Sequence, residues 1–189
     1  SSEHERVKLL VTGTANLMSN LPHVIAQQLD LYRKAGLDVE VEIAGGGTHA
    51  VQALLGGNCE VVLGFLDHPM RMFSQGRKLR AFAALTRYSA NVVIVSPAAQ
   101  KPIRQIQELR GTKVGVSDLG SQNHHFINRL LVRNGLSPAD ITPIAVGSQA
   151  SAVAALERGR IDAWSGFDPA VTAMISRFPS TTVLADTRT

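Results

Sequence analysis

The 189-residue chain is 44% hydrophobic and 18% charged and carries a net charge of +4. This is the composition of an ordinary globular protein, and no apolar run approaches the length of a membrane span. The single cysteine, Cys59, excludes an internal disulfide and a thiolate metal cluster. Lysines and arginines are scattered and not interleaved with aromatic residues, which favours a solvated basic surface over a nucleic-acid interface.

The first half of the chain alternates apolar runs with amphipathic segments. Residues 1–6 are polar, and we expect them to be disordered. The apolar runs predict strands at Val7–Thr12, Val39–Ala44, Glu60–Phe65, Arg80–Thr86 and Asn91–Val95. Helices are expected between them, from Pro22 to Gly36, from Thr48 to Gly57, and from Asp67 or His68 to Gly76.

The second half repeats this plan after Ser96–Pro102, which holds two prolines and reads as a passage between lobes. Strands are predicted at Thr112–Ser117, Ile141–Val146, Ile161–Ser165 and Thr181–Ala185, with helices ending at Gly135, spanning Gln149–Arg158 and beginning at Asp168. The alternation predicts mostly parallel sheets with right-handed crossovers. We therefore expect an α/β chain with lobe 1 at residues 7–95, the passage at 96–102 and lobe 2 at 103–189.

An internal repeat supports this division. Residues 50–67 read AVQALLGGNCEVVLGFLD and residues 152–168 read AVAALERGRIDAWSGFD. In each copy a helix stops at a glycine, a short strand follows, and the strand opens into a Gly-Phe turn. Two such lobes predict a cleft between them that binds a small molecule.

The loops that follow the strands are the expected place for chemistry, because ligands of open α/β sheets bind at the carboxyl ends of strands. Ser121, after Gly120, is the strongest candidate to hold an oxyanion with the amides of Gln122 and Asn123 at a helix N-terminus; alternatively it only caps its own helix. Arg and Lys are absent from these loops, which disfavours a polyanionic ligand.

Other candidates carry less chemistry. Several histidines lie in or just after the loops, but without metal-ligand spacing, so they are expected to be hydrogen-bond partners or exposed residues and no metal is predicted. Phe65 and Phe167 hold equivalent places in the repeat and either stack on a flat ligand or pack under their turns. No catalytic motif or cofactor-binding motif is present in these residues, so neither an enzyme nor a cofactor is expected.

The order and spacing of many short motifs resemble the nitrate/sulfonate/taurine class of ABC-transporter substrate-binding proteins. The matching segments are Pro22–Ala26, Gly36–Glu40, Gly45–Gly47, Gly57 to Gly64, Lys101–Ile103, Leu109–Val116, Gly120-Ser121, Gly135-Leu136 and Gly159–Ala163. The resemblance covers roughly residues 7 to 180. It implies a type II periplasmic-binding-protein fold and an extracytoplasmic protein that hands a small organic solute, such as a sulfonate, carboxylate or N-heterocycle, to a membrane permease.

The resemblance also implies which residues contact the solute. These are Asn16, Asn20, Thr48, Phe65, Asp67, Ser117, Ser121, Gln122, Asn123, Phe167 and Asp168. Two residues depart from the family pattern. Asp30 stands where the family often has glycine, and Asp118 places a negative charge in the loop expected to bind the solute.

The resemblance further implies that a C-terminal segment, absent from these residues, packs on lobe 1. We therefore expect exposed apolar surface on lobe 1, and either a homodimer or a swapped assembly. Two alternatives stay open on the same fold. One is the effector domain of a LysR-type regulator, which would need a DNA-binding helix-turn-helix upstream. The other is an enzyme similar to thiamine-pyrimidine synthases, which would need a cysteine-rich motif.

Overall fold

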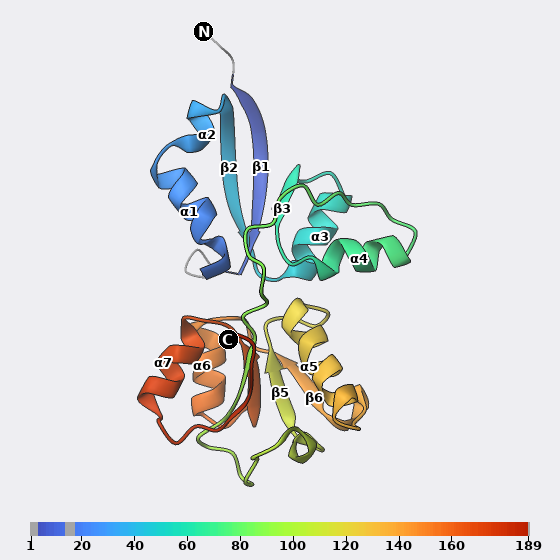
Figure 1. Ribbon diagram of the computed structural model, residues 1–189, viewed down its shortest axis with the longest axis vertical. Coiled ribbons are helices and arrows are strands. Elements are labelled where there is room, and N and C mark those ends of the chain that lie inside the picture. The colour runs from blue at the N-terminus through green and yellow to red at the C-terminus, as the bar shows by residue number, and fades with distance from the viewer. Residues whose placement is uncertain (1–3, 14–17, 189) are drawn as a thin grey trace. The chain divides into compact units, whose positions relative to one another are not determined.

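The computed structural model describes residues 4–13 and 18–188 and divides into two compact units, Ser1–Arg87 and Tyr88–Thr189 (Figure 1). The predicted disorder of residues 1–6 is wrong for Glu5 and Arg6, which already belong to the first strand; residues 1–3 lie outside the described residues. Among the described residues, no helix is long and apolar enough to cross a bilayer.

Unit 1 is built on a parallel sheet of three strands in the order β2-β1-β3, here called sheet A. Its strands are β1 (Glu5–Thr12), β2 (Leu37–Ala44) and β3 (Val61–Leu63). Figure 1 shows α1 (Leu21–Gln28) and α2 (Leu31–Lys34) beside β2, and α3 (Gly47–Leu55) and α4 (Asp67–Ser74) beside β3. A short 3-10 turn, Met18–Asn20, precedes α1. All three strands run the same way, so their carboxyl ends meet at one edge.

The helix predicted from Pro22 to Gly36 is divided in two. Asp30 takes a left-handed conformation with φ 56°, and the chain turns there between α1 and α2. An L-residue adopts this conformation at some cost, and glycine adopts it freely. Asp30, noted above as standing where the resembled family often has glycine, is therefore a residue with positive φ.

The predicted strand Arg80–Thr86 is wrong. Residues 77–91 form neither helix nor strand, and most of their side chains are exposed. The run is apolar enough for a strand, but a strand needs a hydrogen-bonded neighbour, and no described strand pairs with it. Local pattern alone could not reveal that missing neighbour.

Unit 2 is built on a mixed sheet of five strands in the order β6-β5-β7-β4-β8, here called sheet B. Its strands are β4 (Val92–Val95), β5 (Lys113–Val116), β6 (Thr142–Ala145), β7 (Ala163–Gly166) and β8 (Val183–Asp186). Its helices are α5 (Gln122–Arg133), α6 (Ala150–Glu157) and α7 (Ala170–Arg177), with short 3-10 turns at Ile106–Leu109 and Pro138–Asp140. Strands β5, β6 and β7 are parallel, while β4 runs antiparallel to both β7 and β8.

Strand β4 corrects the predicted domain map. The sequence assigns Asn91–Val95 to lobe 1 and Ser96–Pro102 to the passage, but β4 lies inside sheet B. Ser96 is buried and its hydroxyl donates to Leu156 O, so the segment after β4 also belongs to unit 2. All four residues of β4 are buried, because the strand lies within the sheet and both of its faces are covered.

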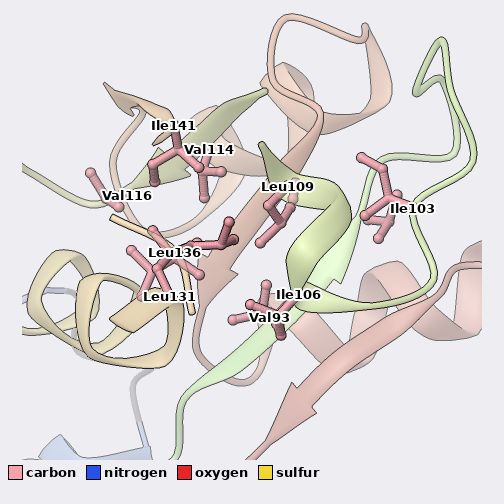
Figure 2. Close-up of a cluster of buried hydrophobic side chains, with 12 residues drawn as sticks. Val93, Ile103, Ile106, Leu109, Val114, Val116, Leu131, Leu136 and Ile141 are labelled. Atoms are coloured by element: carbon pink, nitrogen blue, oxygen red, sulfur yellow. The ribbon is translucent and has the colours of Figure 1, made fainter. Parts of the chain in front are cut away.

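Two hydrophobic clusters cover the two faces of sheet B. On one face Val93 and Val95 pack with the side chains of α5 and the Ile106–Leu109 turn (Figure 2). On the other face Val92 and Ile94 pack with Trp164 and with α6 and α7. Alternate residues of a strand point to opposite faces, so this one strand contributes to both clusters. Unit 2 is therefore a three-layer α/β/α structure.

The two copies of the repeat adopt the predicted helix-to-strand form. The first copy gives α3 followed by β3, and the second gives α6 followed by β7. The α/β fold class with mostly parallel sheets, predicted from the sequence, is confirmed; within sheet B only β4 runs antiparallel to its neighbours.

Candidate functional site

The carboxyl edge of sheet A is held together by side-chain hydrogen bonds between its strands and loops. The Thr12 hydroxyl donates to Leu63 O at 3.0 Å, and Asn20 Nδ2 donates to Thr12 O at 3.1 Å. Asn20 is only 2% exposed. This candidate from the sequence therefore fixes the chain after β1, whereas Asn16 lies outside the described residues.

Next to this edge, α3 and α4 approach each other closely at Gly47. His68 is 2% exposed, and its ring lies where a β-carbon on Gly47 would stand. Arg71 Nη2 lies 3.4 Å from His68 Nδ1. Only glycine permits this approach, so the glycine-rich turn positions α3 against His68.

The remaining candidates of unit 1 lie at the starts of these two helices. Thr48 and Phe65 are half-buried. Asp67 is the first residue of α4, and both of its carboxylate oxygens are buried without a hydrogen-bond partner in the described chain. The structure therefore brings Asn20, Phe65 and Asp67 to the ends of β1 and β3, as the sequence predicts for residues that follow parallel strands.

At the carboxyl edge of sheet B, Asn123 is the centre of a buried hydrogen-bond cluster. Its Oδ1 accepts from the Ser117 amide at 3.3 Å, from the Ser117 hydroxyl at 2.9 Å and from the Ser121 hydroxyl at 2.5 Å. Its Nδ2 donates to Ser165 O at 2.6 Å, and the Ser165 hydroxyl donates back to Asn123 O at 3.1 Å. The cluster joins the ends of β5 and β7 to the start of α5.

Ser121 therefore does something that neither sequence hypothesis described. It occupies the N-cap position of α5, but its hydroxyl makes no capping hydrogen bond and donates to Asn123 instead. The first-turn amides of α5, which have no partner within the helix, are thus left without a capping side chain from Ser121. An uncapped helix N-terminus with its positive partial charge favours an oxyanion.

The histidines near the edges have protein partners. His23 Nδ1 lies 2.9 Å from the Tyr32 hydroxyl, and burial lowers the pKa of His23 below its ordinary value. His124 Nδ1 accepts from the Gly120 amide at 2.8 Å, and burial, followed by the neighbouring His125, lowers the pKa of His124. Within residues 4–13 and 18–188, no three histidine, cysteine, aspartate or glutamate side chains form a metal-binding group.

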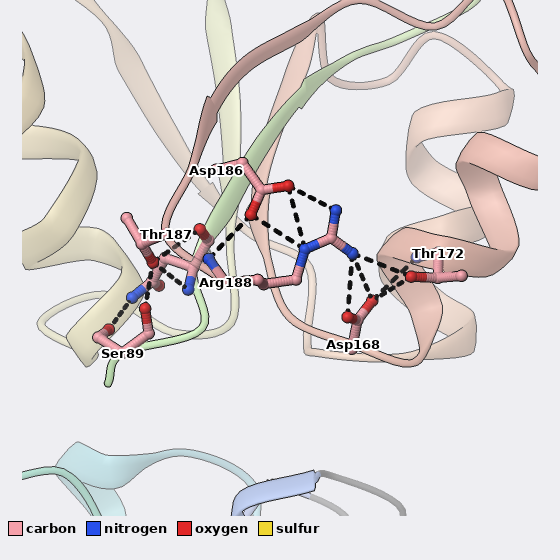
Figure 3. A network of polar contacts seen from close by, with 7 residues as sticks. Ser89, Asp168, Thr172, Asp186, Thr187 and Arg188 are labelled. Carbon is pink, nitrogen blue, oxygen red and sulfur yellow. Dashed lines mark hydrogen bonds and ion pairs between the residues drawn. The ribbon is translucent and has the colours of Figure 1, made fainter. Parts of the chain in front are cut away.

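Sequence reasoning missed Arg188, which lies at the same edge of sheet B (Figure 3). Its guanidinium pairs with Asp186 at 2.6 Å and with Asp168 at 3.0 Å, and it donates to the Thr172 hydroxyl at 3.0 Å. Asp168 was expected to contact a solute, but this carboxylate is already engaged. Arg188 follows a strand whose carboxyl end reaches this edge only because β8 is antiparallel to β4, so no local pattern could have identified it.

The charges of this network are mutually stabilised. Burial alone would raise the pKa of Asp168, but hydrogen bonds from Thr172 and Arg188 outweigh it and hold the pKa below its ordinary value. The Arg188 guanidinium likewise lowers the pKa of Asp186. Hydrogen bonds to Asp186 and Asp168 raise the pKa of Arg188. The network is thus fully ionised at neutral pH.

A second missed group lies at the amino end of β4. Val92 pairs with Gly166, so Ser89 and Asn91 reach the carboxyl end of β7. The backbone of Asn91 is already hydrogen-bonded within unit 2. Its N–H donates to Thr187 Oγ1 at 2.9 Å and its carbonyl accepts from the Thr187 amide at 3.0 Å. Gln122, a candidate from the sequence, donates from Nε2 to the Ser89 hydroxyl at 2.8 Å. Phe167 is buried at 7% exposure, which favours packing under its turn.

Comparison with known proteins identifies the family. The family model described as NMT1/THI5 like matches residues 18–179. The chain belongs to the NMT1/THI5-like family. A protein of Escherichia coli (strain K12) named for binding aliphatic sulfonates is 36% identical over 86 residues, which are 46% of this chain and 26% of that protein.

Solved structures share the fold. A structure from Bordetella bronchiseptica RB50 matches 99% of the chain with a TM-score of 0.87 and 36% identity, and the chain covers 58% of it. The alkanesulfonate-binding protein SsuA from Xanthomonas axonopodis pv. citri, bound to MOPS, matches all of the chain with a TM-score of 0.71 and 24% identity, with 63% of that protein covered. The fold is that of type II periplasmic binding proteins, and the chain spans less than two thirds of the length of these relatives.

Proposed function

We propose that this chain carries the solute-binding fold of an extracytoplasmic binding protein that serves an ABC importer, and that it catalyses no reaction. Family membership supports this, together with relatives named for binding sulfonates. On this proposal the solute is a small organic acid, with a sulfonate favoured over a carboxylate or an N-heterocycle. Its partners are the solute and the permease subunits of the importer, and it works in the periplasm or its equivalent.

The start of α5 is the observation that carries the proposal. Ser121 turns its hydroxyl to Asn123, so the amides of Gln122 and Asn123 are left without that side chain as a cap. The Asn123 cluster fixes these amides to the ends of β5 and β7. Fixed, uncapped amides at a helix N-terminus suit the oxygens of a sulfonate or carboxylate. Arg188 is saturated by two carboxylates, so the acid is bound by backbone donors rather than by a guanidinium.

The enzyme alternative has less support. A thiamine-pyrimidine synthase branch would use a cysteine-rich motif, and the chain has one cysteine, Cys59, which is 4% exposed. Burial raises the pKa of its thiol, with the Glu60 carboxylate acting in the same direction, so little reactive thiolate is present at neutral pH. For the regulator alternative, no described feature of either unit points to DNA.

A calorimetric titration of the chain with ethanesulfonate, propanoate and imidazole tests the proposal. We expect ethanesulfonate to bind most tightly. The Ser121→Ala variant should bind it about fivefold more weakly, because loss of one hydrogen bond of roughly 1 kcal/mol loosens the α5 amides. Ser137→Ala, which removes a cap from a short turn elsewhere in unit 2, should leave the affinity unchanged. Turnover of a bound compound would contradict the proposal.

Self-association is a separate proposal. Unit 1 exposes large apolar side chains, including Ile25 at 45%, Leu29 at 56% and Ile43 at 56% exposure. Apolar surface that stays in water favours association with a second copy. Sedimentation velocity at low micromolar concentration should show a species heavier than the 20.2 kDa monomer. A monomer at every concentration tested would rule this out.

A further inference from the structure

A second concave site lies at the edge of sheet B opposite the proposed solute edge. Strand β4 runs antiparallel to β7, so Val95 pairs with Ala163 at the amino end of β7, whereas Val92 pairs with Gly166 at its carboxyl end. The Val95 amide also donates to Thr182 O at 2.9 Å, which brings the segment before β8 to this amino edge. Residues of the two segments line a cavity of about 350 Å³, and they are residues 95–97, 99–104 and 180–182.

The lining of this cavity is basic. Lys101 and Arg104 both line it, and among the residues that the structure describes no aspartate, glutamate or aromatic side chain does. Ser180 and Thr182 add hydroxyl groups that can donate hydrogen bonds. The cavity therefore offers charged and neutral donors to an anion, but no ring on which a nucleobase could stack.

The Arg104 guanidinium is free to meet an anion. The side chain is exposed, and within residues 4–13 and 18–188 it forms no ion pair or hydrogen bond. The nearest acid along the chain, Glu108, accepts from the Arg104 backbone amide at 2.6 Å and belongs to the capping box of the following 3-10 turn. Lys101 Nζ donates to Arg110 O at 2.9 Å, which leaves two of its three N–H groups. Both cations therefore keep donors for a ligand.

Neighbouring charges do not neutralise these two cations. Asp140 pairs with Arg110 at 2.5 Å, Glu157 pairs with Arg177 at 2.6 Å, and Asp162 accepts from a backbone amide at 2.8 Å. The loops at this edge hold seven Lys and Arg residues and four acids, which leaves a net charge of +3. These loops are residues 96–113, 134–142, 157–163 and 177–183. The field at the amino edge therefore attracts anions.

We propose that this cavity binds a phosphomonoester group, whose oxygens accept from the Arg104 guanidinium, the Lys101 ammonium and the hydroxyls of Ser180 and Thr182. Two unopposed cations match two negative charges. A phosphomonoester carries nearly two charges at neutral pH, whereas a sulfonate or a carboxylate carries one. The planar guanidinium also suits two oxygens of a phosphate at once. The site lies at the far end of the strands from the solute edge and does not rest on the proposed function.

Calorimetry on the whole chain at pH 8 tests the proposal with glycerol 3-phosphate, with acetate as the singly charged control and glycerol as the uncharged one. We expect glycerol 3-phosphate to bind one to one, acetate to bind about tenfold more weakly or less, and glycerol not to bind. Arg104→Gln should weaken glycerol 3-phosphate about tenfold, because a charge-assisted bidentate contact is lost. Arg104→Lys keeps the charge and should lose less. Arg129→Gln, which removes an exposed charge from α5, should change nothing.

A second comparison separates this site from the solute edge. Ser121→Ala should leave the affinity for glycerol 3-phosphate unchanged, and Arg104→Gln should leave the affinity for ethanesulfonate unchanged. Co-sedimentation with phosphatidylcholine vesicles, with and without phosphatidic acid, identifies the source of the phosphate. Binding to phosphatidic acid that Arg104→Gln abolishes supports a lipid headgroup, and its absence supports a free compound.

Two results would overturn the inference and leave the proposed function standing. One is that glycerol 3-phosphate does not bind, or binds no better than acetate. The other is that Ser121→Ala weakens its binding while Arg104→Gln does not, because the compound would then occupy the solute edge. The comparison of the three compounds on the wild-type chain decides even if a variant does not fold.

Discussion

Asn123 is the residue on which the carboxyl edge of sheet B depends. It is 1% exposed, and its carboxamide joins Ser117, Ser121 and Ser165. Replacing it with alanine leaves several buried polar groups unpaired, each costing roughly 1–3 kcal/mol. We expect Asn123→Ala to lower the free energy of unfolding by about 3 kcal/mol in urea denaturation. Asn128→Ala on the same helix should change it by less than about 0.5 kcal/mol.

Arg188 gives the protein a specific dependence on pH. The folded state lowers the pKa of Asp168 and Asp186 below the ordinary value of 3.8. The stability that follows is present in full above that value and is lost as the pH falls through the lower folded values. Arg188→Met should therefore destabilise the protein by roughly 1–2 kcal/mol at pH 7, since these side chains are about a quarter exposed.

The same variant should lose its effect in acid. As the pH falls from 3.8 through the lowered folded pKa values of Asp168 and Asp186, the two carboxylates become protonated, so the difference in urea midpoint between wild type and Arg188→Met should shrink steadily. Arg158→Met, at an exposed position of unit 2, serves as the control at each pH. A difference that persists unchanged at low pH would show that Arg188 acts through packing rather than through charge.

At the scale of elements, the packing of α3 against α4 depends on Gly47. Alanine in a helix is normally more stable than glycine by up to about 1 kcal/mol, but a β-carbon here would overlap the buried His68 ring. We expect Gly47→Ala to destabilise the protein by about 1–3 kcal/mol in thermal or urea unfolding. Gly45→Ala is the matched control, because nothing lies within 4 Å of its β-carbon position.

A double variant identifies the cause. If the overlap with His68 is responsible, Gly47→Ala should cost much less in a His68→Ala background than in wild type. Equal stability of Gly47→Ala and Gly45→Ala would mean that α3 and α4 adjust without loss, and that the close approach is not required.

At the scale of the whole molecule, the boundary between units lies near Arg87 rather than at Ser96–Pro102. Residues 77–91 have no helix or strand and expose most of their side chains, whereas Ser96 is buried and hydrogen-bonded within unit 2. Proteases cut where the backbone is exposed and unpaired. Brief trypsin treatment should therefore cut first after Arg77, Lys78, Arg80 or Arg87, as mass spectrometry would show. First cleavage after Arg104 would instead support the boundary predicted from the sequence.

The sequence by itself determined the local structure and the family. Apolar periodicity, glycine stops and the internal repeat placed nearly every helix and strand to within a few residues, because these signals act between neighbours in the chain. The family resemblance, carried by short motifs in order, agrees with the match over residues 18–179. Of the candidate residues, Ser117, Ser121 and Asn123 do lie together at one edge, as expected of residues between a strand end and a helix start.

The tertiary structure decided which segments become neighbours. A run such as Val92–Val95 shows that a strand is buried on both faces, but not which sheet it joins, and its antiparallel pairing brings Ser89 and Asn91 to the edge of sheet B. The same pairing brings Arg188 to Asp168, twenty residues away in the chain. The sequence likewise could not show that the Ser121 hydroxyl donates to Asn123 instead of capping its own helix. That hydrogen bond depends on where Ser165 O holds the Asn123 carboxamide. Long-range pairing is set by the whole fold, and so the chemistry at this edge could only be read once the strands were placed.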